Sequence, residues 1–554
     1  MRADPDGRTG REIGDERLIP YAGRWVAQIR GRVVGHGGTP ELARRAALSV
    51  RFKEIPEVFY VPSLQPLNFS VLVERVAEVL PSEMPVYLVG GAVRDALLNL
   101  ESHDLDFVMA GDVLAIARQV ANRIGAAFFV LDAERSTARL ILDEPDGERA
   151  VLDFSAMRGP DLDSDLRSRD FTINAMAVDV RATQELYDPL GGAIDLRQKR
   201  LKACSSESIR EDPLRILRAI RFAAGFNLLI APETRAQMHR DVNLIVKVSA
   251  ERIRDELFRI LAGPKPGASL RALNILGVFP FILPELETLK KVQQSPPHHN
   301  DVWRHSLEVV DRLDEVLDAL DPSYDPDKAA NLFLGVLVLR LGRYRHQIAA
   351  HLEQPVSLER PLRALLFFAA LYHDVGKPVT QQVDEQGKIR FFGHDQIGAA
   401  LAAERGRELR LNNQEIDRLK TIIRRHMWPT LMAQEPTGPG RRAVYRFFRA
   451  TGPAGIDICL LSLADTLATY GPELSPDTWA RHLDVVRILF EAWWEYPEQQ
   501  VNPPAIVNGN DLMERFGLPP GPLIGELLEL IREAQASAEI STAEEAYKLV
   551  ESKI

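Results

Sequence analysis

The apolar pattern of this chain changes near residue 205, and that change constrains its fold more than any other feature. Upstream, helix patterns alternate with strand patterns, as in VLVERVAEVL, VYLVGG, AVRDALLN, DLDFVMA and VLAIARQVANRIG, and further strands are expected at AAFFVL, ARLILD and AVLDFS. Such alternation predicts a mixed α/β domain. Downstream, amphipathic stretches such as DPLRILRAIRFAAGF and ERIRDELFRILAG predict helices joined by turns that contain Pro and Gly.

A short module is expected ahead of the α/β region. RWVAQIR and RVVGHG predict two strands with a tight turn at Gly31, and EVFYVP predicts a third. Between the second and third strands, TPELARRAALSV begins with Thr, Pro and Glu, which favours the start of a helix. The prediction is therefore a ββαβ module, with partner docking and an extra RNA contact both open as its role.

A chain of 554 residues exceeds what one hydrophobic core supports, so several domains are expected. The predicted fold class is α+β. The predicted domains are the N-terminal module in residues 1–62, a small mixed α/β head in 63–200, a helical neck in 201–290, a second helical domain in 291–475 and a helical tail in 476–554.

Composition points to a cytoplasmic protein. No stretch approaches the roughly 20 apolar residues that span a bilayer, and MRADPDGRTGREIGDER lacks the apolar core of a secretory signal. Cys204 and Cys459 are too few for a disulfide framework and lack the spacing of a zinc site.

The net charge of −10 argues against a generally basic RNA-coating protein, but RNA binding depends on local clusters. Two clusters of basic residues stand out, with solvated helix faces as the alternative explanation of each. The first comprises Arg197, Lys199, Arg200, Lys202, Arg210, Arg215, Arg218 and Arg221, and the second comprises Arg424, Arg425, Arg441, Arg442, Arg446 and Arg449.

The motif VYLVGGAVRD predicts a strand that ends in two glycines and leads directly into a helix. Gly90 and Gly91 would let the backbone approach a phosphate closely, and the helix start offers N–H groups and a positive dipole end. Taken alone, the motif also fits an ordinary strand–helix turn.

The motif DLDFV places two carboxylates on one side of a strand. Side chains alternate along a strand, so Asp104 and Asp106 share a face opposite Leu105 and Phe107. Adjacent carboxylates repel one another, and a divalent metal relieves that repulsion. Mg²⁺ with carboxylate and triphosphate oxygens is the usual combination, and two ions could clamp the attacking hydroxyl and the leaving pyrophosphate. A solvated strand edge is the alternative for the pair alone.

Together these motifs resemble the head of class II tRNA nucleotidyltransferases, the CCA-adding enzymes, and of the similar bacterial poly(A) polymerases, which implies a polymerase-beta-like head. The resemblance continues in order. RDFTINAMA looks like the family's ribose-holding motif, DPLGGAIDL like its hinge between head and neck, EDPLRILRAIRF like its nucleotide-reading motif and ERIRDELFRIL like its neck-stabilising helix.

The resemblance implies a nucleotide site around the two metal carboxylates. Arg169 and Asn174 are expected to contact phosphate and ribose, and Asp153 supplies either a third carboxylate or a structural contact. The full set of expected nucleotide-binding residues is Gly90, Gly91, Arg94, Asp95, Arg169, Asp170, Asn174, Glu211, Asp212, Arg215, Arg218 and Arg221.

The motif EDPLR suggests how a base is selected. If Glu211, Asp212 and Arg215 share the first turn of a helix, Arg215 lies on the face of Asp212. Asp accepts from the exocyclic amine of cytosine or adenine while Arg donates to the ring nitrogen, so C and A are accepted and U and G rejected without a template. A helix cap with a surface ion pair is the alternative.

Only AMRGPDLDSDLRS separates VLDFS from RDFTINA, where family members that complete CCA carry a long flexible loop. In the family a short loop goes with partial activities such as CC addition. The predicted function is therefore the addition of C, A or both to tRNA 3′ ends from CTP and ATP, with Mg²⁺ and release of pyrophosphate. Poly(A) polymerase is the close alternative, and the oligomeric state is left open.

A second site is expected in the histidine-bearing region. Imidazole and carboxylate together suit a transition metal or another divalent ion. LYHDVGKP and its surroundings resemble HD-domain metal-dependent phosphohydrolases, implying a phosphomonoester or 2′,3′-cyclic phosphodiester substrate and allowing two metals. A phosphohydrolase whose head only binds RNA is the alternative of another class. The expected ligands are His305, His373, Asp374, His394, His426 and Asp465.

The tail contains PPGPLIG directly before an expected helix. Its N–H groups could meet an RNA phosphate, and a purely structural turn is equally consistent with the sequence.

Overall fold

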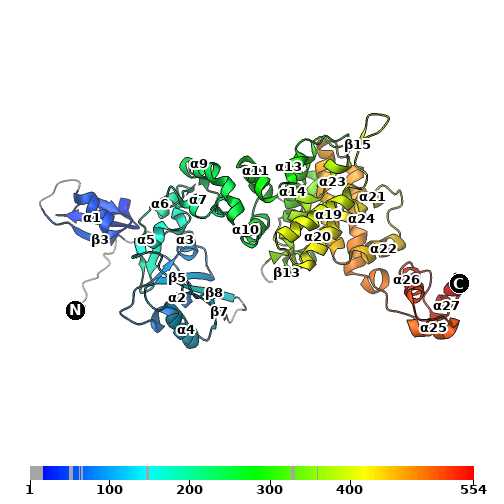
Figure 1. Cartoon of the computed structure of the whole chain (residues 1–554), viewed down its shortest axis with the longest axis horizontal. Coiled ribbons are helices and arrows are strands. Elements are labelled where there is room, and N and C mark those ends of the chain that lie inside the picture. Colours follow the sequence, from blue (N-terminus) through cyan, green and yellow to red (C-terminus); the bar gives the residue numbers. More distant parts are fainter. Residues whose placement is uncertain are drawn as a thin grey trace. The chain divides into compact units, whose positions relative to one another are not determined.

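The computed structural model divides into two compact units, Met1–Leu244 and Ile245–Ile554, which are described separately (Figure 1). It describes residues 16–48, 54–61, 63, 66–144, 147, 149–325, 331–357 and 360–554. The expected α+β class is confirmed: a mixed α/β head stands in the first unit, and the second is helical apart from strands of two or three residues.

The N-terminal module has the predicted ββαβ order. It comprises β1 (Arg24–Ile29), β2 (Arg32–Gly37), α1 (Pro40–Leu48) and β3 (Glu57–Val61), preceded by a 3-10 helix (Glu16–Tyr21). Its antiparallel sheet has the order β2-β1-β3. Residues 1–15, 49–53 and 62 of the predicted module lie outside the described residues.

The module docks on the head. Trp25 Nε1 donates to the carbonyl of Leu186 at 3.1 Å, and the Asp188 amide donates to the carbonyl of Gly38 at 2.7 Å. A side chain at Gly38 would overlap the Asp188 carbonyl, so this contact requires glycine.

The head is built on a seven-stranded sheet of order β10-β9-β4-β5-β8-β7-β6, in which β5 and β8 are parallel and the other neighbours antiparallel. The strands are β4 (Val86–Val89), β5 (Asp104–Met109), β6 (Ala127–Asp132), β7 (Thr137–Asp143), β8 (Arg149–Ala156), β9 (Ala177–Asp179) and β10 (Ala182–Tyr187).

Helices cover one face of this sheet and part of the other. The helices α2 (Val71–Val79) and α4 (Val113–Ile124) lie on one face, where Phe107 and Phe154 stack in the core (Figure 1). On the opposite face, α5 (Leu162–Arg167) packs leucines against Val89 and Val108. The helix α3 (Gly91–Leu97) follows β4, and η2 (Thr172–Asn174) packs against α6 (Gly192–Arg197).

Short helices complete the first unit beyond the sheet. They are α7 (Ser208–Glu211), α8 (Arg215–Gly225) and α9 (Pro232–Asp241). A two-residue parallel pairing of β11 (Arg200–Leu201) with β12 (Leu229–Ile230) ties them to the end of the head.

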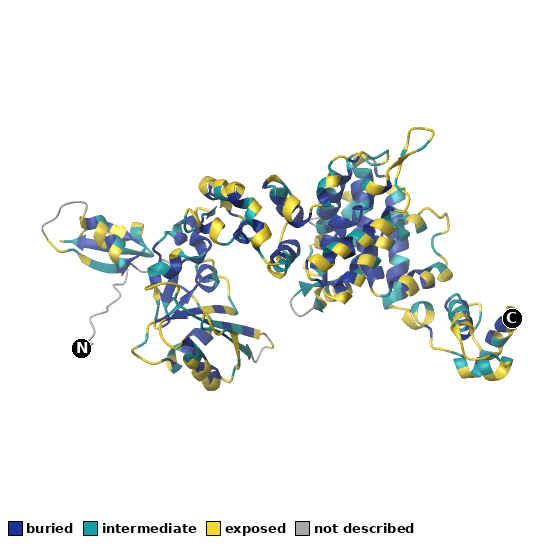
Figure 2. Ribbon diagram, in the orientation of Figure 1, coloured by how far each residue is buried: buried dark blue, intermediate teal, exposed yellow. Residues whose placement is uncertain are grey.

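The second unit is a helical body around α23 (Ala454–Tyr470), which is buried along nearly its whole length (Figure 2). The helices α14 (Val302–Ala319), α17 (Leu362–Tyr372) and α20 (Asn413–Arg425) pack against it, and α24 (Pro476–Trp494) packs against α15 (Leu332–Leu341) and α23. The other helices of the body used below are α10 (Ala250–Ala262), α11 (Pro266–Ile275), α19 (His394–Glu408), α21 (Trp428–Met432) and α22 (Arg441–Thr451).

The tail has a small core of its own, which includes Leu512, Ile531 and Val550. It is formed by α25 (Gly509–Phe516), α26 (Pro522–Ala536) and α27 (Ala543–Glu551). The PPGPLIG segment leads into α26, as the sequence predicts.

Among the described residues no single helix is both long and apolar enough to cross a membrane. One pair of helices, Arg441–Thr451 and Ala454–Glu473, reaches that length and composition only together, with a bend of 107° between them.

Candidate active sites

Asp104 and Asp106 lie side by side on one face of β5. Both are exposed, whereas Leu105 and Phe107 between and beyond them are buried in the core on the other face. This is the alternation that the sequence predicts. Asp106 also pairs in register with Asp153 of β8, so three carboxylates share the face.

The neighbourhood of Asp106 favours a bound cation. Desolvation by the surrounding protein raises the pKa of its carboxyl to about 6; Arg169 opposes the rise, and Asp153 and Asp104 add to it. Asp153 itself accepts two hydrogen bonds from Arg139, at 2.9 and 2.8 Å, so the contact observed for it is structural. A divalent ion at Asp104 and Asp106 would offset the remaining negative charge, which fits the donor set.

The glycine turn brings backbone against these carboxylates. Gly90 has φ +77°, and a Cβ there would lie 3.1 Å from Asp106 Oδ2 and 3.3 Å from a terminal guanidinium nitrogen of Arg169. Glycine therefore lets the start of α3, the Asp106 carboxylate and the Arg169 guanidinium converge. Gly91 is the first residue of α3.

A buried chain of hydrogen bonds joins the other predicted residues. Arg94 binds Asp95 through two nitrogens at 2.9 Å each and donates to Asn174 Oδ1 at 2.7 Å. Asn174 donates to Asp170 at 3.1 Å, and Arg218 donates to the other Asp170 oxygen at 2.6 Å.

These contacts shift the role of Arg94. Its guanidinium is committed to Asp95 and Asn174 and lies 4.2 Å from the Phe226 ring centre, so it contacts Asn174, one of the residues expected at the ribose. Arg169, which binds Asp165 at 3.1 Å, stands closer to the carboxylates and to the glycine turn.

The EDPLR motif departs from its prediction. Glu211 ends α7, Asp212 is extended (φ −141°, ψ 95°), and α8 begins only at Arg215. Pro213 explains the break, because a residue before proline is driven out of helical geometry. The prediction that the three residues share the first turn of one helix is therefore wrong.

Arg215 is nevertheless held firmly. Its guanidinium donates to Ser208 Oγ at 2.7 Å and to the Ser168 carbonyl at 2.8 Å, and Glu211 lies 3.7 Å away. Arg221 stacks over Phe222 on the same helix, at 4.4 Å from the ring centre.

The segment between β8 and RDFTINA is short and internally bonded. Asp161 caps α5 by accepting from the Ser164 amide, and Asp165 accepts from the Arg158 amide at 2.9 Å and from Arg169. Ser168, at the end of this segment, carries the carbonyl that holds Arg215. The segment thus connects the metal face with the expected base-selecting residue.

The six predicted ligands of the second site converge inside the helical body. Asp374 Oδ2 lies 3.1 Å from His373 Nε2 and 3.6 Å from His305 Nε2, and Asp374 Oδ1 lies 3.5 Å from His394 Nε2. Asp465 Oδ1 lies 3.1 Å from His305 Nε2.

Two groups of potential ligand atoms share Asp374: one with His305 and His373, the other with His394 and His426. Atoms that ligate one ion at about 2 Å lie about 3 Å apart, so both groups fit a divalent metal, with Asp374 as a bridge.

The histidine tautomers are set for metal binding. Nδ1 of His373, His394 and His426 donates to the carbonyl three residues earlier, at 2.8, 2.7 and 2.7 Å. Nε2 is then the lone-pair nitrogen and faces the cluster. Burial alone would raise the pKa of the Asp374 carboxyl, but His373 and Lys377 outweigh it and hold that pKa well below its usual range.

A cavity of about 560 Å³ opens onto this cluster. Lys377, Lys388 and Arg390 line it together with the aromatic rings of Phe391 and Phe392. Lys377 Nζ lies 2.6 Å from Asp374 Oδ2 and donates to Gln294. Cationic side chains beside this candidate metal site suit a phosphate group.

Sequence reasoning missed three residues of these sites. Lys377 is part of the quoted HDVGKP motif, and His298 stands in the HH pair before α14, so both carried a signal. Arg139 carried none, because its pairing with Asp153 follows from the register of β7 with β8.

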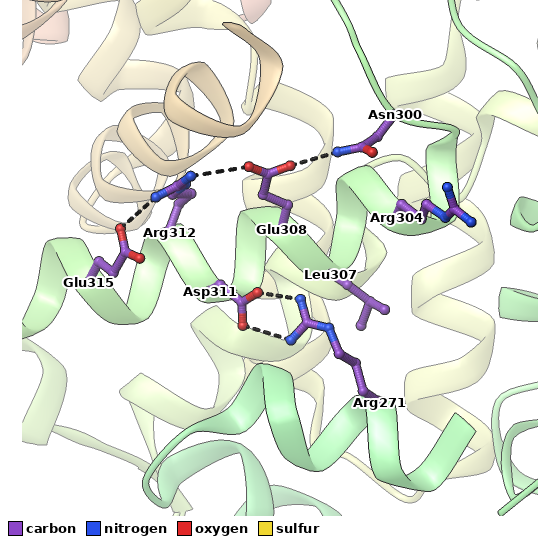
Figure 3. Close-up of a pocket in the computed structure, with 8 residues that line it drawn as sticks. All are labelled: Arg271, Asn300, Arg304, Leu307, Glu308, Asp311, Arg312 and Glu315. Atoms are coloured by element: carbon purple, nitrogen blue, oxygen red, sulfur yellow. Dashed lines mark hydrogen bonds and ion pairs between the residues drawn. The ribbon is translucent and has the colours of Figure 1, made fainter. Parts of the chain in front are cut away.

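Another hollow lies between α11 and α14 (Figure 3). Its charged side chains pair with one another: Arg271 binds Asp311 through two nitrogens, and Arg312 joins Glu308 and Glu315. These pairs account for its polarity, and we assign it no chemistry.

Three of the six arginines of the second basic cluster pair with carboxylates. Arg446 pairs with Glu533 at 2.6 Å and Arg449 with Glu529 at 2.9 Å, both on α26, while Arg442 binds Glu539 just beyond it at 2.7 Å. The solvated-face explanation suits α22 better than an RNA contact.

Known families match along most of the chain. The Poly A polymerase head domain matches residues 86–202, the probable RNA and SrmB-binding site of polymerase A matches 225–290, and the HD domain matches 302–470. A tRNA nucleotidyltransferase domain 2 matches 502–549.

Solved structures share the fold. A CCA-adding enzyme with CTP superposes with a TM-score of 0.55 at 20% identity, covering 88% of this chain and 98% of that one. The Thermotoga maritima CCA-adding enzyme complexed with tRNA gives 0.51 at 21% identity, covering 88% and 100%.

Curated relatives are more similar in sequence. The A-adding tRNA nucleotidyltransferase of Deinococcus radiodurans is 33% identical over 84% of this chain and 94% of its own length. The CC-adding tRNA nucleotidyltransferase of Thermus thermophilus is 32% identical over 83% and 91%. The chain belongs to the tRNA nucleotidyltransferase family.

Proposed function

We propose that this chain adds cytidine nucleotides from CTP to the 3′ end of tRNA and stops before the terminal A. The observation that carries the proposal is the short bonded segment between β8 and RDFTINA, in place of a long flexible loop. A site that switches from C to A must move its base-selecting residues. Here Ser168 and Ser208 hold Arg215 in one position, which favours one base geometry.

Each residue then has a defined task. Asp104 and Asp106 would hold Mg²⁺, which supplies positive charge to the triphosphate and the primer hydroxyl. Gly90 and Arg169 bind the phosphates, and Asp212 and Arg215 accept from and donate to the cytosine edge. The 3′ hydroxyl attacks the α-phosphorus, the bond to the β-phosphate oxygen breaks, and pyrophosphate leaves. Because the substrate is tRNA, we propose the cytoplasm as the location of this activity.

Product sequencing tests the proposal directly. A tRNA that lacks its CCA end is incubated with CTP, with ATP, or with both, and the same is done with tRNA that already carries CC. We expect two C residues from CTP and no addition of A to the CC-bearing tRNA. Addition of A to that tRNA would contradict the proposal, and long A tracts would indicate a poly(A) polymerase instead.

We also propose a second activity, hydrolysis of a phosphomonoester or cyclic phosphodiester at the HD site. Its carrying observation is the pair of ligand groups bridged by Asp374, with Nε2 of each histidine turned to the cluster. The imidazole-rich set favours a transition metal over Mg²⁺. Hydrolysis of 2′,3′-cyclic AMP and of p-nitrophenyl phosphate with Mn²⁺ or Ni²⁺, by wild type and Asp374→Asn, tests it. Equal rates in the two proteins would refute it.

A further inference from the structure

The sheet face that carries the metal carboxylates continues beyond them toward an open edge. Register pairing sets Asp106 of β5 beside Asp153 of β8, Asp153 opposite Arg139 of β7, and Arg139 opposite Phe129 of β6. Residues paired in register point to the same face, so these four side chains form one row across the sheet.

The end of this row on β6, at Phe129, is unusually apolar for an exposed sheet edge. Phe129 is 49% exposed, and β6, the last strand of the sheet, has no buried residue. The next residue, Val130, points to the opposite face of the sheet, because it pairs with Ala138, which belongs to the core under α4. Phe129 therefore presents an aromatic ring on the metal side, and Val130 presents a similar exposed apolar surface on the other side.

Arginines lie in and beside this row: Arg139 is one of its four members, and Arg169 stands 3.3 Å from the position of a Cβ at Gly90, which also borders Asp106. Burial lowers the pKa of the Arg158 guanidinium, and nearby Arg169, Arg215 and Arg135 lower it further while Asp165 opposes them. A local excess of positive charge attracts an anion such as the phosphate backbone of RNA. Arg135 stands at the turn between β6 and β7 with 84% of its side chain exposed, and its ion pair with Asp132 is long at 3.7 Å.

The spacing fits a short length of single-stranded RNA. Three strand spacings of about 4.8 Å put Phe129 about 14 Å from Asp106. Stacked nucleotides rise about 3.4 Å each and unstacked ones span more, so this distance corresponds to at most about four nucleotides behind the reacting 3′ hydroxyl. An aromatic ring for a base, with arginines for the backbone, is the usual surface for single-stranded nucleic acid.

We propose that Phe129 is a stacking platform for an unpaired nucleotide of the growing tRNA 3′ end, with Arg135 contacting its backbone. This inference rests on the proposed nucleotidyl transfer at Asp104 and Asp106 and adds the track on which the primer lies. Continuity of the row with the metal carboxylates favours RNA over a protein strand pairing with the β6 edge.

Equilibrium binding tests the platform without relying on catalysis. The full-length chain is titrated with fluorescent tRNA that already carries both added C residues, and with the same tRNA trimmed of all unpaired 3′ nucleotides. Phe129→Ala should weaken binding of the first RNA about tenfold and of the trimmed RNA less than twofold, while Phe129→Tyr retains affinity. Val130→Ala, the matched control on the opposite face, should bind both RNAs as wild type does.

Two further readouts separate the contributions. Arg135→Ala should reduce the slope of log affinity against log salt by about one, whereas Phe129→Ala should leave that slope unchanged. Equal losses on both RNAs, or no loss, would overturn the platform. A change of oligomeric state in Phe129→Ala at unchanged RNA affinity would show that the edge binds protein. Failure of wild type to extend tRNA with CTP would instead refute the proposed transfer, and the binding result would stand apart from it.

Discussion

The two candidate metal sites of this chain differ in the type and the burial of their expected ligands. In the head, Asp104 and Asp106 stand exposed on an open sheet face, among arginines and a third carboxylate. In the HD site, histidines and aspartates converge inside a helical body, and His305 and His373 are each only 1% exposed.

This difference in ligand type and burial indicates how each site would acquire its metal. Two exposed carboxylates form an incomplete shell for a hard cation, which the oxygens of a triphosphate complete. The imidazole-rich site provides its whole shell from the protein. We therefore expect the metal of the head to arrive with the nucleotide and that of the HD site to stay with the protein, so each site should fail independently of the other.

The largest expected effect is on nucleotide transfer. Asp106→Asn keeps the shape of the side chain but removes the charge that binds the metal, and should lower incorporation of labelled CTP by about 1000-fold or more. Val130→Ala serves as a folded control at an exposed position. Asp106→Asn should keep the metal content and the hydrolytic rate of the HD site. If the variant retained incorporation, the assignment of Asp106 as a metal ligand would be wrong. A parallel loss of hydrolysis at the HD site would refute the independence of the two sites.

The second prediction removes a ligand from the other site. His373→Ala takes away one of the nitrogens that face Asp374 and should lower transition-metal affinity by about 100-fold or more, since even outer contacts are worth 10–100-fold. Metal content after gel filtration and the rate of phosphoester hydrolysis measure it. C addition with Mg²⁺ should stay within about twofold of wild type. Full metal content in the variant would contradict the ligand assignment.

Acid should act on the two units in opposite directions. Burial lowers the pKa of His482 to about 4, below its ordinary 6.5, so the unfolded chain takes up a proton first. The stability held by neutral His482 is complete above pH 6.5 and is lost as pH falls toward 4, by about 3 kcal/mol. Asp106 has a raised pKa of about 6. Lowering the pH through that value protonates its carboxyl, removes an unfavourable desolvated charge and stabilises the head.

Tryptophan fluorescence can follow this difference, because Trp25 alone lies in the first unit and the other tryptophans lie in the second. Urea unfolding monitored this way should show a marked loss of stability between pH 7 and 5. His482→Gln, which can still bond Ser462 and Thr466, should flatten that dependence. An unchanged pH dependence in the variant would assign the loss to other groups.

The two sites also differ in how far sequence could predict them. The spacing of Asp104 and Asp106 predicts that they share a face, because side chains alternate along a strand, while their role as a site came from the glycine motif and the family resemblance. The HD ligands were found one by one through short motifs, yet only packing shows that Asp374 bridges two groups. Arg139 reaches Asp153 through strand register, which no local pattern carries.

Other features needed tertiary contacts or closer attention to local rules. The docking of the N-terminal module joins Gly38 to Asp188, 150 positions along the chain, and nothing near Gly38 indicates it. The error at EDPLR was avoidable, because Pro213 already marks Asp212 as a residue disfavoured in a helix.

The smallest expected effect concerns the arginines of α22. Arg446 is 64% exposed at its side chain but pairs with Glu533, and exposed pairs of this kind contribute at most about 1 kcal/mol. Arg446→Gln should therefore change tRNA affinity by less than about twofold and leave its salt dependence unaltered, whereas Arg135→Ala in the head alters both. This contrast assigns RNA binding by charge to the open sheet face and not to α22. If Arg446→Gln instead weakened binding tenfold with a shallower salt slope, the pairing with α26 would have to open when tRNA binds, and α22 would join the RNA-binding surface.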